Sequence, residues 1–251
     1  MLNKFTAEEI GVHTQERVLI KSDSKEISTI VDIIEGIVKK NEIAVSSELK
    51  EIMNLKNKQK VDVVVSDSPK SLEYIKKKLN KERLSEKEIN EIIKDIVHNS
   101  LSEAEIALFV SAMYKQEMNM EETISLIKAI LKNGNKLSLK KKLIVDKHSI
   151  GGIPGRTTPI IVSICAAAGL IFPKTSSRAI TTPSGTADAM EVLCRVDLPV
   201  SEVKKIVNKI NACLVWGGSL NLAPADDKII QVERKENWVN FKIESGVSGF
   251  V

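Results

Sequence analysis

Between residues 143 and 216 the sequence alternates short apolar runs with turns that are rich in glycine, serine and threonine. The runs "LIVD" (143–146), "GLIFP" (169–173) and "CLVW" (213–216) have the length of buried strands, and a helix-like segment lies between each run and the next. Parallel strands need such long crossover connections, whereas antiparallel strands can be joined by tight turns. The alternation therefore predicts an α/β domain with a parallel sheet.

The first 70 residues have a different pattern, with β-branched and nearly alternating runs at 16–23, 26–34 and 60–67. The segments 9–20 and 52–65 also resemble one another at an offset of 43 residues. Two similar halves of this size favour a pseudo-symmetric, barrel-like β domain, and a chance match is the alternative.

Residues 85–134 are typical of amphipathic helices, and Ser85 is the expected N-cap of the first one. The predicted fold class is thus multidomain α/β, with a small N-terminal β-barrel-like domain, a helical domain and a partial parallel-sheet α/β domain. The expected domains are 1–82 (β-rich), 83–140 with a contribution from 198–212 (helical), 141–197 with 213–234 (α/β), and an atypical tail at 235–251.

Composition excludes two classes of partner. The formal net charge is only +4 and aromatic residues make up 4% of the chain, which argues against a nucleic-acid-binding surface. The longest charge-free run, 157–173, is shorter than the ~20 residues that span a bilayer, so we expect a buried helix and no membrane contact. The three cysteines lie among apolar neighbours without metal-ligand spacing, which predicts buried free thiols in the cytoplasm.

The first polar turn, "KHSIGGIPG" (147–155), has the parts of an anion site. Lys147 supplies charge, the Ser149 hydroxyl can donate a hydrogen bond, and the glycines allow close approach of the backbone. Its spacing matches neither the P-loop nor the Rossmann fingerprint. An ordinary glycine-rich turn is the alternative.

The second polar turn, "TSSRAITTPSGT" (175–186), is rich in hydroxyl groups and contains Arg178. Ligands of parallel α/β sheets bind outside the carboxyl ends of the strands, so both turns are expected to face one crevice. Together they predict a phosphate-binding α/β domain with room for a second anionic or hydroxylated group.

Five motifs in order, "KHSIGG", "KTSSRAIT", "SGTAD", "GGSLNLAPADD" and "QVER", resemble the thymidine phosphorylase family. The motif "SSRAIT" and the presence of an N-terminal β domain resemble members of its archaeal AMP phosphorylase branch. The resemblance covers roughly residues 5–234. It implies phosphorolysis, in which inorganic phosphate as co-substrate attacks C1′ of a nucleoside 5′-monophosphate. From AMP the products would be adenine and ribose 1,5-bisphosphate, with no other cofactor and no metal.

The resemblance also implies roles for individual residues. The phosphate-binding residues would be Lys147, Ser149, Thr158, Ser176 and Thr186. The nucleotide-binding residues would be Gly152, Ser177, Arg178, Ala179, Ile180, Thr181, Thr182 and Thr186. Arg178 is the expected partner of the 5′-phosphate or the ribose, and His148 is a possible helper in proton transfer.

The resemblance ends after "QVER". The aspartate that protonates the leaving base in the family falls at Val239, so no catalytic acid is identified, and neither Asp226 nor Asp227 is an obvious substitute. The expected function is AMP phosphorolysis. The alternatives are a thymidine or pyrimidine nucleoside phosphorylase, and a non-catalytic phosphate-binding half that needs a separate C-terminal chain. A homodimer or larger homo-oligomer is expected, as in the family.

Overall fold

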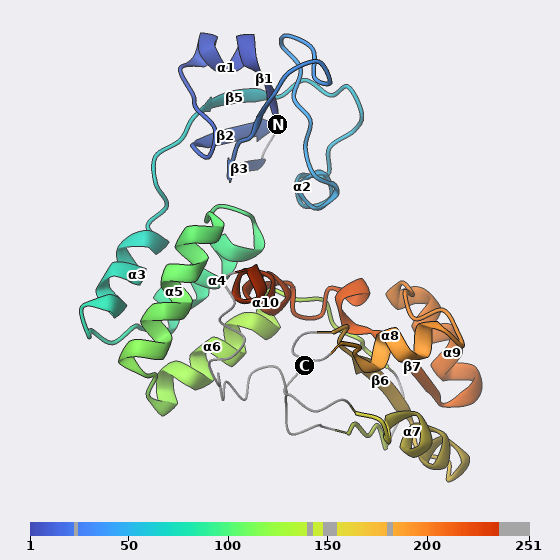
Figure 1. Ribbon diagram of the computed structural model, residues 1–251. Coiled ribbons are helices and arrows are strands. Elements are labelled where there is room, and N and C mark those ends of the chain that lie inside the picture. The colour runs from blue at the N-terminus through green and yellow to red at the C-terminus, as the bar shows by residue number, and fades with distance from the viewer. Residues whose placement is uncertain (23–24, 140–142, 148–154, 180–182, 236–251) are drawn as a thin grey trace. The chain divides into compact units, whose positions relative to one another are not determined.

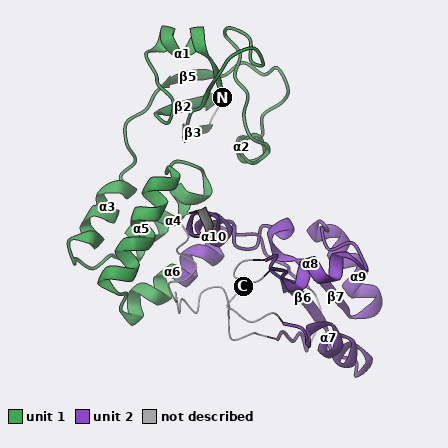
Figure 2. Ribbon diagram, in the orientation of Figure 1, with its two compact units in different colours: residues 1–126 green, residues 127–251 purple. Residues whose placement is uncertain are grey.

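The computed structural model describes residues 1–22, 25–139, 143–147, 155–179 and 183–235 (Figure 1). The chain forms two compact units, residues 1–126 and 127–251 (Figure 2). The first unit contains the strands β1 (Leu2–Asn3), β2 (Arg17–Ser22), β3 (Lys25–Ile30), β4 (Ile33–Ile34) and β5 (Asp62–Val65). Its helices are α1 (Lys4–Ile10), α2 (Ser47–Met53), α3 (Ser71–Leu79), α4 (Glu86–Val97), α5 (Glu103–Gln116) and the first part of α6 (Met120–Lys132).

An antiparallel three-stranded sheet in the order β3-β2-β5 forms the centre of the N-terminal part. The three predicted strands are present, but the run at 26–34 divides into β3 and β4, and β4 pairs in parallel with β1. Val18 and Ile20 of β2 alternate with more exposed neighbours and lie in the core. The two similar halves of the sequence supply β2 and β5, and Ile20 pairs with Val63 between them. The barrel-like closure stays a prediction.

Helix α4 begins after Ser85, as predicted, whereas α1 and α2 lie in the stretch for which the sequence indicated only strands. Ser85 accepts a hydrogen bond from the backbone N–H of Glu88, whose carboxylate accepts one from Ser85, which completes a capping box. Ser102 and Glu105 make the same arrangement at the start of α5. Helix α4 then buries four isoleucines at the spacing of one helix face, Ile89, Ile92, Ile93 and Ile96.

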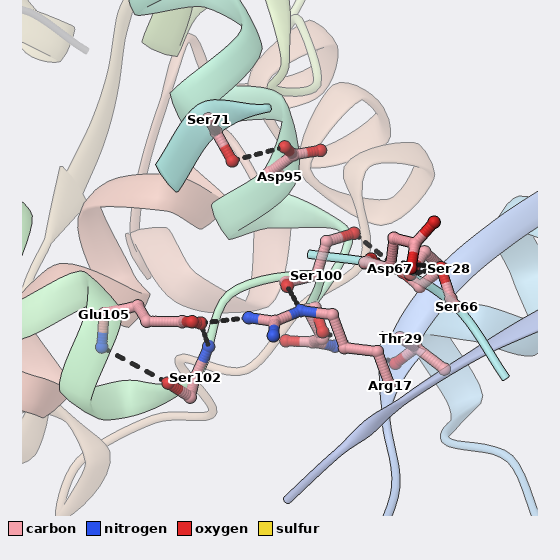
Figure 3. A network of polar contacts seen from close by, with 11 residues as sticks. Arg17, Ser28, Thr29, Ser66, Asp67, Ser71, Asp95, Ser100, Ser102 and Glu105 are labelled. Carbon is pink, nitrogen blue, oxygen red and sulfur yellow. Dashed lines mark hydrogen bonds and ion pairs between the residues drawn. The ribbon is translucent and has the colours of Figure 1, made fainter. Parts of the chain in front are cut away.

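A polar network joins the N-terminal sheet to the loop between α4 and α5 (Figure 3). The Arg17 guanidinium donates to the Ser100 carbonyl at 2.9 Å and pairs with Glu105. Glu105 also accepts from the backbone N–H of Ser102, so one carboxylate serves both the helix cap and the ion pair. The Ser100 hydroxyl donates to the Ser28 carbonyl at 2.7 Å. These charge-assisted bonds fasten β2 and β3 to the helical part of the same unit.

The helical part encloses a buried ion pair. Lys78 of α3 donates to both carboxylate oxygens of Glu122 in α6 at 2.9 Å, and the two side chains are only 4% and 3% exposed. The backbone N–H of Leu84 donates to the same carboxylate at 2.9 Å. Because every one of these groups is removed from water, loss of one partner leaves an uncompensated charge.

Replacement of Lys78 alone should therefore destabilise the chain strongly. We expect Lys78→Met to lower the free energy of unfolding by roughly 3–5 kcal/mol, because Glu122 stays buried without its partner. The matched control is Lys76→Met, an exposed lysine on the same helix, with an expected change within about 0.5 kcal/mol. Urea unfolding followed by circular dichroism measures both, and equal losses would contradict the expectation.

The second unit contains the predicted parallel α/β arrangement. Its elements are α7 (Thr158–Ala167), β6 (Phe172–Ser176), α8 (Thr186–Glu191), α9 (Val200–Ile210), β7 (Ala212–Trp216), the 3₁₀ helix η1 (Gly217–Leu220) and α10 (Pro224–Lys235). Strands β6 and β7 pair in parallel from Phe172↔Ala212 to Ser176↔Trp216. Ile144 forms an isolated parallel bridge with Ile171 on the other side.

Helix α9 buries Val203 and Val207 against Ile171 and Val215 of the sheet region. The domain prediction assigned 198–212 to the helical domain, whereas the structure packs this helix on β6 and β7 within the second unit. The apolar face of α9 therefore packs against the sheet of the second unit.

Three burial predictions in the second unit were wrong. Leu143 and Ile144 of the predicted buried strand are 73% and 46% exposed. In the helix predicted to be buried, only one side of α7 contacts β6 and β7, so Ile160 and Ile164 are more than 60% exposed. Cys194 is also exposed, while Cys165 and Cys213 are half-buried. An apolar run shows that a segment can be buried, but burial also requires a neighbour on each face.

None of the helices in the described ranges combines the length and the low charge needed to cross a membrane.

Candidate functional site

The polar turns of the second unit follow neighbouring strand ends. Lys147 follows the segment that bridges to Ile171, Ser177 follows β6, and Gly217 follows β7. Figure 1 shows β6 and β7 side by side. Because these neighbours are parallel, their carboxyl ends meet at one edge of the sheet, where α/β proteins bind ligands.

Lys147, Thr158 and Thr186 converge on the backbone of Gly155. The Lys147 Nζ donates to Thr158 Oγ1 at 3.3 Å. A Cβ atom added to Gly155 would lie 2.5 Å from Thr158 Oγ1, 3.3 Å from Lys147 Nζ and 3.4 Å from Thr186 Oγ1. One ammonium group and two hydroxyls from three separate segments thus surround one point. This set of donors fits a phosphate oxyanion.

Helix α7 contributes to the same place. Thr158 is its first residue, is only 2% exposed, and donates its backbone N–H to the Gly155 carbonyl at 2.8 Å. Pro159 follows inside the first turn, where proline is favoured because no N–H is needed. The positive end of this ten-residue helix therefore lies beside the donors of Lys147 and Thr158.

The second turn closes on itself at Gly185. A Cβ atom at Gly185 would lie 2.6 Å from the Ser177 carbonyl oxygen and 2.5 Å from the Arg178 carbonyl carbon. The Ser177 carbonyl accepts from the backbone N–H of Ala187 at 3.3 Å. Only glycine permits this approach of the two ends of the turn, which brings Thr186 toward Gly155.

Arg178 is held by two carboxylates and an indole ring. Its guanidinium donates to Asp188 at 3.0 Å and to both oxygens of Glu191 at 2.6 and 2.8 Å. It also lies over the Trp216 ring, 4.8 Å from the centroid. The hydrogen bonds from Arg178 lower the pKa of Glu191, and the bonds to Glu191 and then Asp188 raise the pKa of Arg178.

The two predicted cations thus differ in their charge environment. The charge of Arg178 is balanced by its carboxylate partners. Lys147 makes no ion pair with any residue that the structure describes. Lys147 is therefore the stronger candidate for attracting an anion, and Arg178 is better suited to directional hydrogen bonding.

The sequence-based prediction missed three residues that contact Arg178: Asp188, Glu191 and Trp216. A signal for Asp188 was available, because an acidic residue three positions after the N-cap commonly bonds to the N-cap backbone. Glu191 follows three residues later, at the spacing of one helix face. Trp216 becomes relevant only through the β6–β7 register.

Several predicted site residues lie outside the described residues, and their roles stay predictions. These are His148, Ser149, Gly152, Ile180, Thr181, Thr182 and Val239. Ser176, by contrast, is described and ends β6 opposite Trp216.

Helix α10 carries carboxyl groups with raised pKa values. Burial, and secondarily the charge of Asp227, raises the pKa of Asp226 to about 6. Burial, and secondarily the charge of Asp226, raises the pKa of Glu233 to about 7. Both groups bind protons more strongly in the folded chain than in an unfolded one, so stability falls as the pH rises from about 4 to about 7.

Removal of the Glu233 charge should therefore raise stability most at alkaline pH. We expect Glu233→Gln to raise Tm by a few degrees at pH 8 and by less at pH 5, where the native Glu233 keeps most of its proton. The control is Asp197→Asn, an exposed carboxyl. Scanning calorimetry at both pH values measures the effect, and a gain that does not depend on pH would contradict it.

A methyl group at Gly155 should occupy the point where the three donors meet. We expect Gly155→Ala to weaken binding of inorganic phosphate at least tenfold, because its Cβ would lie against Thr158, Lys147 and Thr186. The matched control is Gly217→Ala, whose Cβ would meet its nearest neighbour at an ordinary 3.8 Å. Isothermal titration calorimetry measures both affinities, and unchanged binding by Gly155→Ala would show that phosphate does not use this point.

Two domain descriptions match the chain. "Glycosyl transferase family, helical bundle domain" matches residues 72–134, and "Glycosyl transferase family, a/b domain" matches residues 141–237. Among solved structures, anthranilate phosphoribosyltransferase from Thermus thermophilus resembles the chain with a TM-score of 0.55 at 19% identity. That likeness covers 64% of this chain and 50% of the other, and it concerns the fold alone.

Curated relatives match nearly the whole chain. The AMP phosphorylase of Pyrococcus furiosus is 46% identical over 235 residues, and that of Methanococcus vannielii is 43% identical over 235 residues. The AMP phosphorylase of Thermofilum pendens is 43% identical over 234 residues. Each match covers 93% of this chain and 46% of the relative, so the chain spans about half the length of these relatives. The resemblance predicted from the five motifs is confirmed, and the chain belongs to the glycosyl transferase family of helical-bundle and α/β domains, in its AMP phosphorylase branch.

Proposed function

We propose that this chain carries the phosphate- and nucleotide-binding part of an enzyme that cleaves AMP by phosphorolysis. The observation that carries the proposal is the convergence of Lys147, Thr158 and Thr186 on Gly155. The relatives named AMP phosphorylase favour this substrate over a free thymidine or another pyrimidine nucleoside.

The proposed reaction is the one that the name of the relatives, AMP phosphorylase, implies. An oxygen of inorganic phosphate bonds to C1′ of the ribose while the bond from C1′ to the base nitrogen breaks. The base leaves with that electron pair and takes up a proton, which gives adenine and ribose 1,5-bisphosphate. Lys147 and the two threonine hydroxyls would hold the phosphate oxygens in line with C1′ and balance their charge.

The turn after β6 would hold the nucleotide. We assign Arg178 to the ribose or the 5′-phosphate as a hydrogen-bond donor, since Asp188 and Glu191 already balance its charge. We assign no residue to the protonation of the leaving base, because the position that carries the family aspartate, Val239, lies outside the described residues.

The relatives are about twice as long as this chain, which suggests a second candidate function. As the second candidate function we propose a non-catalytic phosphate-binding half that needs a separate C-terminal chain, since this chain spans about half the length of these relatives. We further propose that the protein is a homo-oligomer in the cytoplasm.

We also propose a barrel-like closure of the N-terminal domain. The pairing of β2 with β5, which come from its two similar halves, supports this closure.

The test is phosphate-dependent release of adenine from AMP by the full 251-residue chain, with CMP, UMP and thymidine as comparators. Chromatography detects the base, and ligand-induced changes in Tm detect binding without turnover. We expect Lys147→Ala to weaken phosphate binding roughly 10- to 100-fold, since a charge-assisted bond is lost. The control is Lys209→Ala, which removes the same charge from an exposed position on α9.

The outcomes separate the two candidates. Adenine release that requires phosphate supports a complete active site. Binding of phosphate and AMP without turnover supports a half-site that needs a separate C-terminal chain. If neither ligand raises Tm, both candidates fail.

A further inference from the structure

Asp188 bonds to both ends of the turn that is assigned to the nucleotide. Its Oδ2 atom accepts from the backbone N–H of Ala179 at 2.7 Å and from that of Gly185 at 2.9 Å. Its Oδ1 atom accepts from the Arg178 guanidinium at 3.0 Å. One carboxylate therefore ties together two backbone positions six residues apart and the side chain beside them.

Glu191 occupies the next position on the same face of α8, but its bonds are of another kind. Both of its oxygens accept from the Arg178 guanidinium. Among the described residues it accepts from no backbone N–H of the turn. Both carboxylates thus balance the charge of Arg178, whereas the hydrogen bonds from the backbone of Ala179 and Gly185 go to Asp188.

We propose that Asp188 is a positioning residue for nucleotide binding, because its carboxylate holds the two ends of the turn at Ala179 and Gly185 in register. The inference rests on the proposed function, since it assigns the turn to the nucleotide. The carboxylate stands at the start of α8, so the turn closes at the place where Thr186 leaves toward Gly155. Asp188 would in this way set the positions of Arg178 and Thr186 without contact to the ligand.

The protonation state of Asp188 suits this role. Burial by itself would raise its pKa, but the hydrogen bonds from Gly185, Ala179 and Arg178 together lower it. The carboxylate is therefore charged near neutral pH and has only acceptors to offer, which both backbone N–H groups require.

A purely electrostatic role predicts the opposite effect on binding. If Asp188 acted only by balancing the charge of Arg178, then its neutralisation would add positive charge to the site and strengthen phosphate binding. Neutralisation of Glu191 would do the same. A positioning role instead separates the two residues, because only the loss of Asp188 releases the backbone of the turn.

The test compares Asp188→Asn with Glu191→Gln in the full chain, with inorganic phosphate and AMP as ligands in calorimetric titrations. We expect Asp188→Asn to weaken AMP binding roughly 10- to 100-fold, since its amide group cannot accept from all three donors. Glu191→Gln should bind phosphate at least as tightly as the unaltered chain. Without ligand, the backbone amides of Ala179 and Gly185 should exchange hydrogen faster in Asp188→Asn and at the original rate in Glu191→Gln.

A third variant covers the case in which Asp188→Asn does not fold. Asp188→Glu keeps the charge but moves the carboxylate by one methylene, so it should also weaken AMP binding and expose the two amides. The proposal is overturned if both Asp188 variants bind AMP normally, if the amides keep their exchange rates, or if Glu191→Gln is as impaired as Asp188→Asn. If the unaltered chain binds neither ligand, the proposed function fails, and the amide exchange still decides whether Asp188 holds the turn.

Discussion

The parallel pairing of β6 with β7 is the interaction on which the candidate site depends. Its register places Ser176 opposite Trp216, so the polar turn after one strand starts beside the indole ring that ends the other. Arg178 reaches that ring because both segments leave the sheet at the same edge. The parallel bridge between Ile144 and Ile171 brings Lys147 to this edge as well. Three segments that are distant in sequence thereby supply one group of donors.

Glycine at two positions of the site lets the backbone lie close to the neighbouring donor groups and backbone atoms. At Gly155 and Gly185 there is no room for a Cβ atom, because hydroxyls, an ammonium group or backbone atoms already stand there. Donors can surround a small anion only if the chain behind them is this close. The two cations of the site differ in charge balance. Asp188 and Glu191 balance the charge of Arg178, and Lys147 is the cation that we assign to the proposed phosphate.

Local patterns in the sequence predicted much of this structure. The N-cap at Ser85 was predicted because its side chain satisfies a nearby backbone group, and such an interaction needs no knowledge of the fold. The parallel pairing of β6 with β7 was predicted from the alternation of strands and helices. Exposure was predicted less well. Leu143, Ile160 and Ile164 are apolar, yet each is more than 60% exposed. Hydrophobicity measures what a side chain gains by burial, not whether a neighbour is there to cover it.

The sequence by itself determined the family, the chemical character of the two polar turns and the start of the helix that follows Ser85. Those properties depend on residue types at fixed spacing, which the chain carries however it folds. Only the tertiary structure decided which residues meet: Thr186 comes to Gly155, Arg178 to Trp216, and Asp188 to the two ends of its turn. These contacts depend on strand register and on backbone approach to within a few ångströms. No residue type alone specifies them, because a contact is a property of two positions in space.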